Sequence, residues 1–122
     1  MSGRPPIDLS GRRVLVVEDE YLLADEVCRE LTVAGAQVIG PAATVASALE
    51  LLRTSARPDA AIIDVNLGGE PVFPVADVLR ARNVPFVFST GYDDWALPPL
   101  HQGTPRCEKP VDLAAILGVL FD

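Results

Sequence analysis

A short apolar run in the middle of the chain constrains the fold most. Ala60, Ala61, Ile62 and Ile63 lead directly into the acidic residue Asp64, and the turn-like residues 67–69 follow. A short apolar run bounded by turn residues is typical of a strand buried in a parallel sheet. Asp64 is then expected at the carboxyl end of that strand, where open α/β sheets carry their ligands. A carboxylate at this place either takes part in chemistry or caps a turn.

The rest of the chain alternates between strand and helix patterns. Further strands are predicted at residues 13–17, 37–40, 85–91 and 106–108, the second of them ended by Pro41. Helices are predicted at residues 21–34, 45–52, 71–82 and 113–120, with Thr44 and Asp112 as N-caps and Gly35 as a stop. Residues 92–105 contain Pro98 and Pro99, which leave room for a shortened or irregular fourth helix.

This alternation predicts an α/β fold with right-handed crossovers and a parallel sheet covered on both faces. Five such units indicate a doubly wound, five-stranded sheet, and the flavodoxin-like strand order 2-1-3-4-5 fits best. Residues 1–11, with Pro5 and Pro6, are expected to form a flexible N-terminal leader, and residues 12–122 one domain. In this order the first and third strands are neighbours, so their carboxyl ends share one edge.

Composition excludes several classes of protein. A chain of 122 residues with 49% hydrophobic and 22% charged residues is typical of one compact soluble domain. The net charge of −7 argues against nucleic-acid binding. No apolar run approaches the roughly 20 residues that span a bilayer. Residues 1–10 lack the apolar core of a signal peptide, so a cytoplasmic location is expected, with Cys28 and Cys107 as free thiols.

Polar residues follow four of the predicted strands. They are Glu18 and Asp19, Asp64, Ser89 and Thr90, and Lys109. Two carboxylates about 4 Å apart repel by on the order of 4 kcal/mol at an effective dielectric near 20. A divalent cation removes this cost, and hard oxygen ligands favour Mg²⁺. A carboxylate nucleophile, a metal, an ammonium and a hydroxyl together indicate phosphoryl transfer, with Asp64 as the acceptor.

These motifs resemble the response-regulator receiver domains of two-component signalling, over residues 14–120. Residues 14–20 resemble the family's first strand with its acidic pair, and Ile62-Ile63-Asp64 resembles the phosphoacceptor strand. Thr90-Gly91 resembles the switch hydroxyl and its small neighbour, and Lys109-Pro110 resembles the lysine that precedes a cis proline. The resemblance implies a CheY-like fold, in which Asp64 accepts phosphate from a sensor histidine kinase or phosphotransfer protein. It also implies Mg²⁺ held by Asp19, Asp64 and the Asn66 carbonyl, with Glu18 acting through water.

A subgroup signature is visible in the fourth predicted strand. Phe88-Ser89-Thr90-Gly91-Tyr92 resembles the Phe-Ala-Thr-Gly-bulky-Tyr (FATGUY) pattern of mostly stand-alone receivers, although Asp93 occupies the last aromatic place. Arg106 stands where many receivers carry the aromatic residue that turns inward on activation. We therefore hypothesise that Tyr92 or Trp95 reports phosphorylation. The resemblance implies a protein that is not an enzyme and is a monomer or weak dimer. It acts either as a phosphate sink or through contacts with another protein, made by the last strand and helix and the segment before them.

Simpler interpretations exist for each residue. Asp64 could cap a turn, Thr90 could be a satisfied strand-end hydroxyl, and Lys109 could be a surface lysine, although every other basic residue is arginine. Glu20 is expected only to favour the positive end of the following helix. His101 is expected to be exposed and without a role.

Other functions also remain open at this point. They are a degenerate receiver that works unphosphorylated, a Mg²⁺-dependent phosphohydrolase that forms an aspartyl phosphate, and a nucleotide- or flavin-binding module. The phosphohydrolase would need a second acid two residues after Asp64, where Asn66 stands, and the nucleotide module would need a phosphate-binding glycine loop.

Overall fold

A computed structural model describes residues 8–90, 103–109 and 111–121. Its core is a five-stranded parallel sheet in the order β2-β1-β3-β6-β7, with a separate two-stranded pair, β4-β5. The strands are β1 (Arg13–Val17), β2 (Gln37–Ala42), β3 (Ala60–Asp64), β4 (Asn66–Leu67), β5 (Glu70–Pro71), β6 (Phe86–Thr90) and β7 (Arg106–Glu108). The helices are α1 (Tyr21–Val33), α2 (Val45–Thr54), α3 (Phe73–Ala81) and α4 (Leu113–Phe121). The predicted flavodoxin-like order of the five sheet strands is confirmed.

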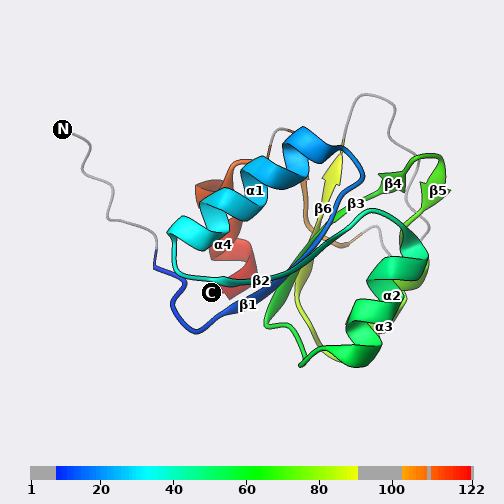
Figure 1. The fold of residues 1–122 in the computed structure, drawn as a ribbon, viewed down its shortest axis with the longest axis horizontal. Coiled ribbons are helices and arrows are strands. Elements are labelled where there is room, and N and C mark those ends of the chain that lie inside the picture. Colours follow the sequence, from blue (N-terminus) through cyan, green and yellow to red (C-terminus); the bar gives the residue numbers. More distant parts are fainter. Residues whose placement is uncertain (1–7, 91–102, 110, 122) are drawn as a thin grey trace.

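Helices cover both faces of the sheet (Figure 1). Leu15, Ile63 and Phe88 face α2 and α3 in one core cluster. Their strand neighbours Val16 and Ile62 face α1 and α4 in a second cluster. Successive residues of a strand point to opposite faces, so the central strands need apolar residues at every position. This is why their sequences are continuous apolar runs.

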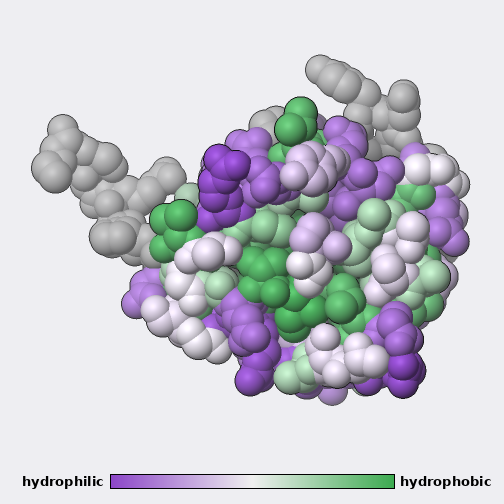
Figure 2. Space-filling view, viewed as in Figure 1, coloured by the Kyte–Doolittle hydropathy of each residue, from purple (hydrophilic) through white to green (hydrophobic). Residues whose placement is uncertain are grey.

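The edge of the sheet at β2 is more open. Hydrophobic side chains gather in the middle of the face that shows β2, between α1 and α2 (Figure 2). The predicted end of this strand at Pro41 was wrong, because β2 continues through Pro41 to Ala42. The pairing with β1 shifts register between Leu15 and Val17, and β2 is an edge strand. Proline is tolerated at irregular edge positions because no further strand requires its missing N–H.

The helix ends follow the predicted caps closely. Thr44 accepts a hydrogen bond from the Ser47 N–H in a capping box at the start of α2. Asp112 accepts one from the Ala114 N–H at 3.2 Å at the start of α4. Gly35 follows the C-cap of α1 with a positive φ of 96°. Such a conformation suits glycine because it has no Cβ.

The predicted start of the third helix was wrong. Glu70 and Pro71 belong to β5, which pairs with β4 in a hairpin, and α3 begins only at Phe73. Gly68 and Gly69 form the two-residue turn, with positive φ angles of 59° and 95°. Two consecutive positive φ angles match the twist of a tight hairpin, and glycine adopts them without a steric cost.

The start of the domain also differs from the prediction. Leu9, placed in the flexible leader, is buried in the core, and its N–H donates to the Ala34 carbonyl at 2.7 Å. Residues 8–11 are therefore held against the domain, because burial of Leu9 stabilises them. The leader assignment for residues 1–7, and residues 92–102 of the irregular helix predicted within 92–105, with Tyr92, Trp95 and His101, lie outside the described residues. Within the described ranges, no helix is long and apolar enough to cross a membrane.

Candidate functional site

Asp64 lies at the carboxyl end of β3 and is buried, with 4% of its surface exposed. Both of its carboxylate oxygens have hydrogen-bond partners. Oδ1 accepts the backbone N–H of Asn66 at 3.0 Å, and Oδ2 lies 2.7 Å from Nζ of Lys109. The carboxylate is therefore oriented by the turn that follows its own strand and by an ammonium from the far end of the chain.

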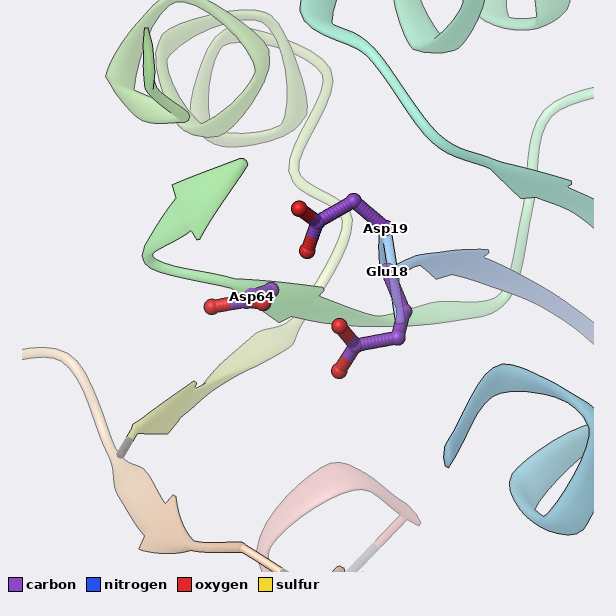
Figure 3. A group of neighbouring side chains, drawn as sticks. All are labelled: Glu18, Asp19 and Asp64. Atoms are coloured by element: carbon purple, nitrogen blue, oxygen red, sulfur yellow. The ribbon is translucent and has the colours of Figure 1, made fainter. Parts of the chain in front are cut away.

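Two further acids follow β1, the strand next to β3. Val17 is in register with Ile63, so Glu18 and Asp19 leave the sheet beside Asp64. Figure 3 shows the carboxylates of Glu18, Asp19 and Asp64 converging from these two strand ends. One carboxylate oxygen from each lies within 4.8 Å of the others. We call Glu18, Asp19 and Asp64 the acidic group.

Lys109 enters the site directly after β7. Its backbone N–H donates to the Thr90 carbonyl at 2.9 Å, which continues the pairing of β6 and β7. Its Nζ atom lies 3.1 Å from Oε1 of Glu18 and 3.7 Å from Oε1 of Glu20, in addition to its contact with Asp64. Its side chain is 15% exposed, so water screens these charges little. Lys109 is the only lysine in the sequence.

Burial and like charge shape the protonation of the site. Desolvation, together with the hydrogen bond and charge of Asp64, raises the pKa of Glu18 to about 7. Burial alone would lower the pKa of Lys109, but its contacts with Asp64 and Glu18 outweigh burial and raise that pKa. Lys109 is thus held as an ammonium, whereas the surroundings of Glu18 favour its protonated form.

The donor set fits a divalent cation. Three converging carboxylates supply hard oxygen ligands, which Mg²⁺ prefers, and a cation would offset the burial and the repulsion by Asp64 that raise the pKa of Glu18. The Asn66 carbonyl was predicted as a further ligand. Asn66 lies opposite Pro71 in the β4–β5 pair, one position from the hydrogen bond of the Val72 N–H to the Val65 carbonyl at 3.1 Å, so 66/71 is a non-hydrogen-bonded pair in which the Asn66 carbonyl points away from β5. The arrangement therefore leaves room for the predicted role of Asn66, which stays a prediction.

Thr90 and the side chain of Asn66 are engaged elsewhere. The Thr90 hydroxyl donates to the Cys107 carbonyl at 3.2 Å, although Thr90 immediately follows Ser89, the register partner of Asp64. Oδ1 of Asn66 accepts the Gly69 N–H at 2.7 Å and so supports the hairpin turn. The structure thus brings together Glu18, Asp19, Asp64 and Lys109, while the Thr90 hydroxyl is directed to β7.

Two residues near the site were missed in the sequence. Glu20 was expected only to favour the start of α1, yet it lies beside Lys109. Gly68 lies in the hairpin next to Asp19, where a Cβ atom would meet Oδ2 of Asp19 at 3.4 Å. Two features of the sequence could have indicated these residues. Glu20 stands two residues after Glu18, and Gly68 belongs to the glycine pair of the turn.

Comparison with known proteins decides the family. No family model matches the chain. Among solved structures the chain is similar to SdrG from Sphingomonas melonis Fr1, with 39% sequence identity and a TM-score of 0.77. The match covers 89% of this chain and 92% of the SdrG chain. The chain also resembles a response regulator receiver domain (CheY-like) from Methylobacillus flagellatus, with 26% identity, 89% and 95% covered, and a TM-score of 0.73. The chain belongs to the response-regulator receiver domains.

Curated proteins with signalling names are similar to this receiver domain as well. Sensory transduction protein LytT from Bacillus cereus is 40% identical over 88 residues, which are 70% of this chain. The chain spans about a third of the length of the curated relatives it matches, 35% in this case. A structure of SdrG in a BeF3-activated conformation is also similar to this chain. The two are 36% identical, with a TM-score of 0.72, and the match covers 92% of this chain and 95% of that chain.

Proposed function

We propose that this receiver domain accepts a phosphoryl group on Asp64, with Mg²⁺, from a phosphohistidine of a sensor histidine kinase or phosphotransfer protein. The observation that carries the proposal is the 2.7 Å contact between Nζ of Lys109 and Oδ2 of Asp64, inside the acidic group. A buried carboxylate nucleophile beside a fixed ammonium and a cation site is suited to phosphoryl transfer.

In the proposed reaction an Asp64 carboxylate oxygen attacks the phosphorus atom of the donor. The new O–P bond forms as the P–N bond to the donor imidazole breaks, and the imidazole nitrogen keeps the electron pair. The Lys109 ammonium stabilises the charge on the transferred phosphoryl oxygens. Bound Mg²⁺, held by Glu18, Asp19, Asp64 and the Asn66 carbonyl, would supply charge compensation at the same oxygens. The domain modifies itself in this scheme and is not an enzyme for an external substrate.

The proposed signal leaves the site through Thr90. Its hydroxyl donates to the Cys107 carbonyl in the present structure. In the phosphorylated state we expect it to turn to a phosphoryl oxygen, which releases a contact between β6 and β7. The surface of β7 and α4 would then act on a downstream protein, or the domain would drain phosphate from its kinase. A cytoplasmic location belongs to the same proposal.

Acetyl phosphate tests the proposal directly. The protein is incubated with acetyl phosphate and Mg²⁺, and intact mass reports covalent phosphate. We expect one adduct in the wild type and in Asp25→Asn, which changes an exposed acid of α1, and none in Asp64→Asn. An adduct that survives Asp64→Asn contradicts the assignment, and its absence from the wild type indicates a degenerate receiver. Multiple-turnover hydrolysis of a phosphomonoester would instead indicate a phosphohydrolase.

A further inference from the structure

Lys109 has one carboxylate neighbour that does not belong to the acidic group. Its Nζ atom lies near Asp64, Glu18 and Glu20, at 2.7, 3.1 and 3.7 Å. Asp64 and Glu18 are candidate cation ligands, whereas Glu20 is not part of the converging set. A bound cation would therefore compete with Lys109 for Asp64 and Glu18, but not for Glu20.

The side chain of Glu20 is free for this contact. Glu20 is the N-cap residue of α1, but its side chain makes no cap hydrogen bond within the described part of the chain. Its backbone N–H instead donates to Oε2 of Glu18 at 3.0 Å, which fixes the chain between the two acids. The Glu20 side chain is 62% exposed and reaches back from the start of α1 to the ammonium.

Charge in the loaded site changes the neighbours of Lys109. A divalent cation at the acidic group repels the ammonium, and phosphorylation of Asp64 replaces the carboxylate charge closest to it with the charge of the phosphoryl oxygens, which the cation shares. Glu20 stays available to the ammonium, because it lies outside the three carboxylates that converge on the cation site. It is then the remaining carboxylate that holds the ammonium close to the transferred group.

We propose that Glu20 is a positioning residue that acts through Lys109 and keeps its ammonium at Asp64 when the cation and the phosphoryl group are bound. The inference rests on the proposed function of Asp64. An ion pair with one exposed partner contributes modestly, so loss of the Glu20 charge is expected to weaken phosphoryl-group binding by about 1.5- to 5-fold. A role restricted to the start of α1 would alter helix stability without changing this binding.

The single lysine of the sequence allows a direct test. The full chain is prepared with isotope-labelled lysine, so that one Cε–Nζ signal reports Lys109. Glu20→Gln is compared with Glu30→Gln, which removes the same charge from an exposed position about 15 Å further along α1. Without ligands, we expect Glu20→Gln to shift the Lys109 signal and Glu30→Gln to leave it in place. Glu20→Asp keeps the charge and should restore part of the wild-type shift.

The second measurement titrates Mg²⁺-loaded protein with beryllofluoride, an analogue of the phosphoryl group, and follows the same signal. Glu20→Gln should bind it about 1.5- to 5-fold more weakly than wild type, and Glu30→Gln should match wild type. Equal or tighter binding by Glu20→Gln, or an unshifted lysine signal, overturns the inference. If the wild type binds no beryllofluoride, the proposed function of Asp64 is overturned instead. The contact between Glu20 and Lys109 still stands in that case when the Lys109 signal differs between wild type and Glu20→Gln without ligands.

Discussion

Nζ of Lys109 lies 2.7 Å from Oδ2 of Asp64, although the two residues are 45 positions apart in the sequence. The parallel register of β3, β6 and β7 brings them together, because each residue stands at or just beyond the carboxyl end of its strand. Both side chains are largely shielded from water. The ammonium therefore compensates buried negative charge at the centre of the proposed phosphorylation site.

Replacing Lys109 should show how far stability depends on its compensation of the buried carboxylates. Lys109→Gln leaves Asp64 and Glu18 buried without their cation, so we expect metal-free stability to fall by about 3 kcal/mol. Mg²⁺ should restore part of the loss, because it compensates the same carboxylates. Urea unfolding with and without Mg²⁺ measures both effects. Arg29→Gln, which breaks an exposed pair with Asp25, is the control and should cost at most about 0.5 kcal/mol. A Lys109→Gln variant as stable as wild type would contradict this account of the site.

The raised pKa of Glu18 predicts a pH dependence of stability. The folded protein keeps a proton on Glu18 between its ordinary pKa of 4.5 and about 7, where the unfolded chain has lost it. Stability from this group is therefore present below pH 4.5 and is lost as pH rises to about 7. We expect a decline of roughly 1 to 3 kcal/mol across this range without metal.

Glu18→Gln removes the titrating group and should flatten this part of the profile, measured by urea unfolding at a series of pH values. Glu30→Gln, an exposed acid on α1, should keep the wild-type slope. Added Mg²⁺ should reduce the decline in the wild type, because it favours the ionised carboxylate. Parallel profiles for wild type and Glu18→Gln would show that Glu18 does not titrate in this range.

The cap of α2 affects stability but not the site. Thr44→Ala removes the oxygen that accepts the Ser47 N–H at 3.0 Å, so unfolding should become easier by about 1 kcal/mol. Thr54→Ala removes only a hydroxyl that donates to the Glu50 carbonyl at the other end of the helix and should change stability by less than 0.5 kcal/mol. Beryllofluoride binding should match wild type in both. Weaker binding by Thr44→Ala would mean that α2 is coupled to the phosphorylation site.

The sequence predicts the sheet and the meeting of distant charges well, because both follow from general rules. Buried parallel strands require continuous apolar runs, and their carboxyl ends fall on one edge. Asp64 stands where such a run stops, and Lys109 directly follows the short strand predicted at residues 106–108, so their proximity follows once the strand order is predicted. The short hairpin of β4 and β5 escapes this reasoning. Its two-residue strands are too short to show any apolar alternation, and only the glycine pair marks its turn.

Other details depend on tertiary contacts that spacing does not encode. Pro41 would end a central strand, but β2 lies at the edge and continues past it. Leu9 stands beside a proline-rich stretch, yet packs into the core near α1. Glu20 follows the acidic pair like an ordinary acid at a helix start. Its contact with Lys109 depends on how a long side chain turns back from α1, which periodicity cannot predict.

The hairpin beside the acidic group leads to the last prediction. Gly68 has a φ of 59°, and a Cβ atom there would lie 3.4 Å from Oδ2 of Asp19. Gly68→Ala therefore adds a strained residue and also places a methyl group against a candidate cation ligand. Gly69→Ala is a matched control, because Gly69 also has a positive φ, of 95°, but its Cβ would meet nothing within 4 Å. Each substitution should cost about 1 to 2 kcal/mol in stability, from the left-handed backbone alone.

Only Gly68→Ala should weaken Mg²⁺ binding, by several-fold, because its methyl group restricts the Asp19 carboxylate and displaces water from it. Isothermal titration of Mg²⁺ into each variant measures the affinity, and thermal unfolding measures the shared backbone cost. Equal Mg²⁺ affinities in the two variants would show that the hairpin lies beside the acidic group without shaping it. Weaker Mg²⁺ binding in Gly68→Ala alone would show that the glycine turn is part of the cation site. The position next to Asp19 would then have to be a glycine for the cation to bind well.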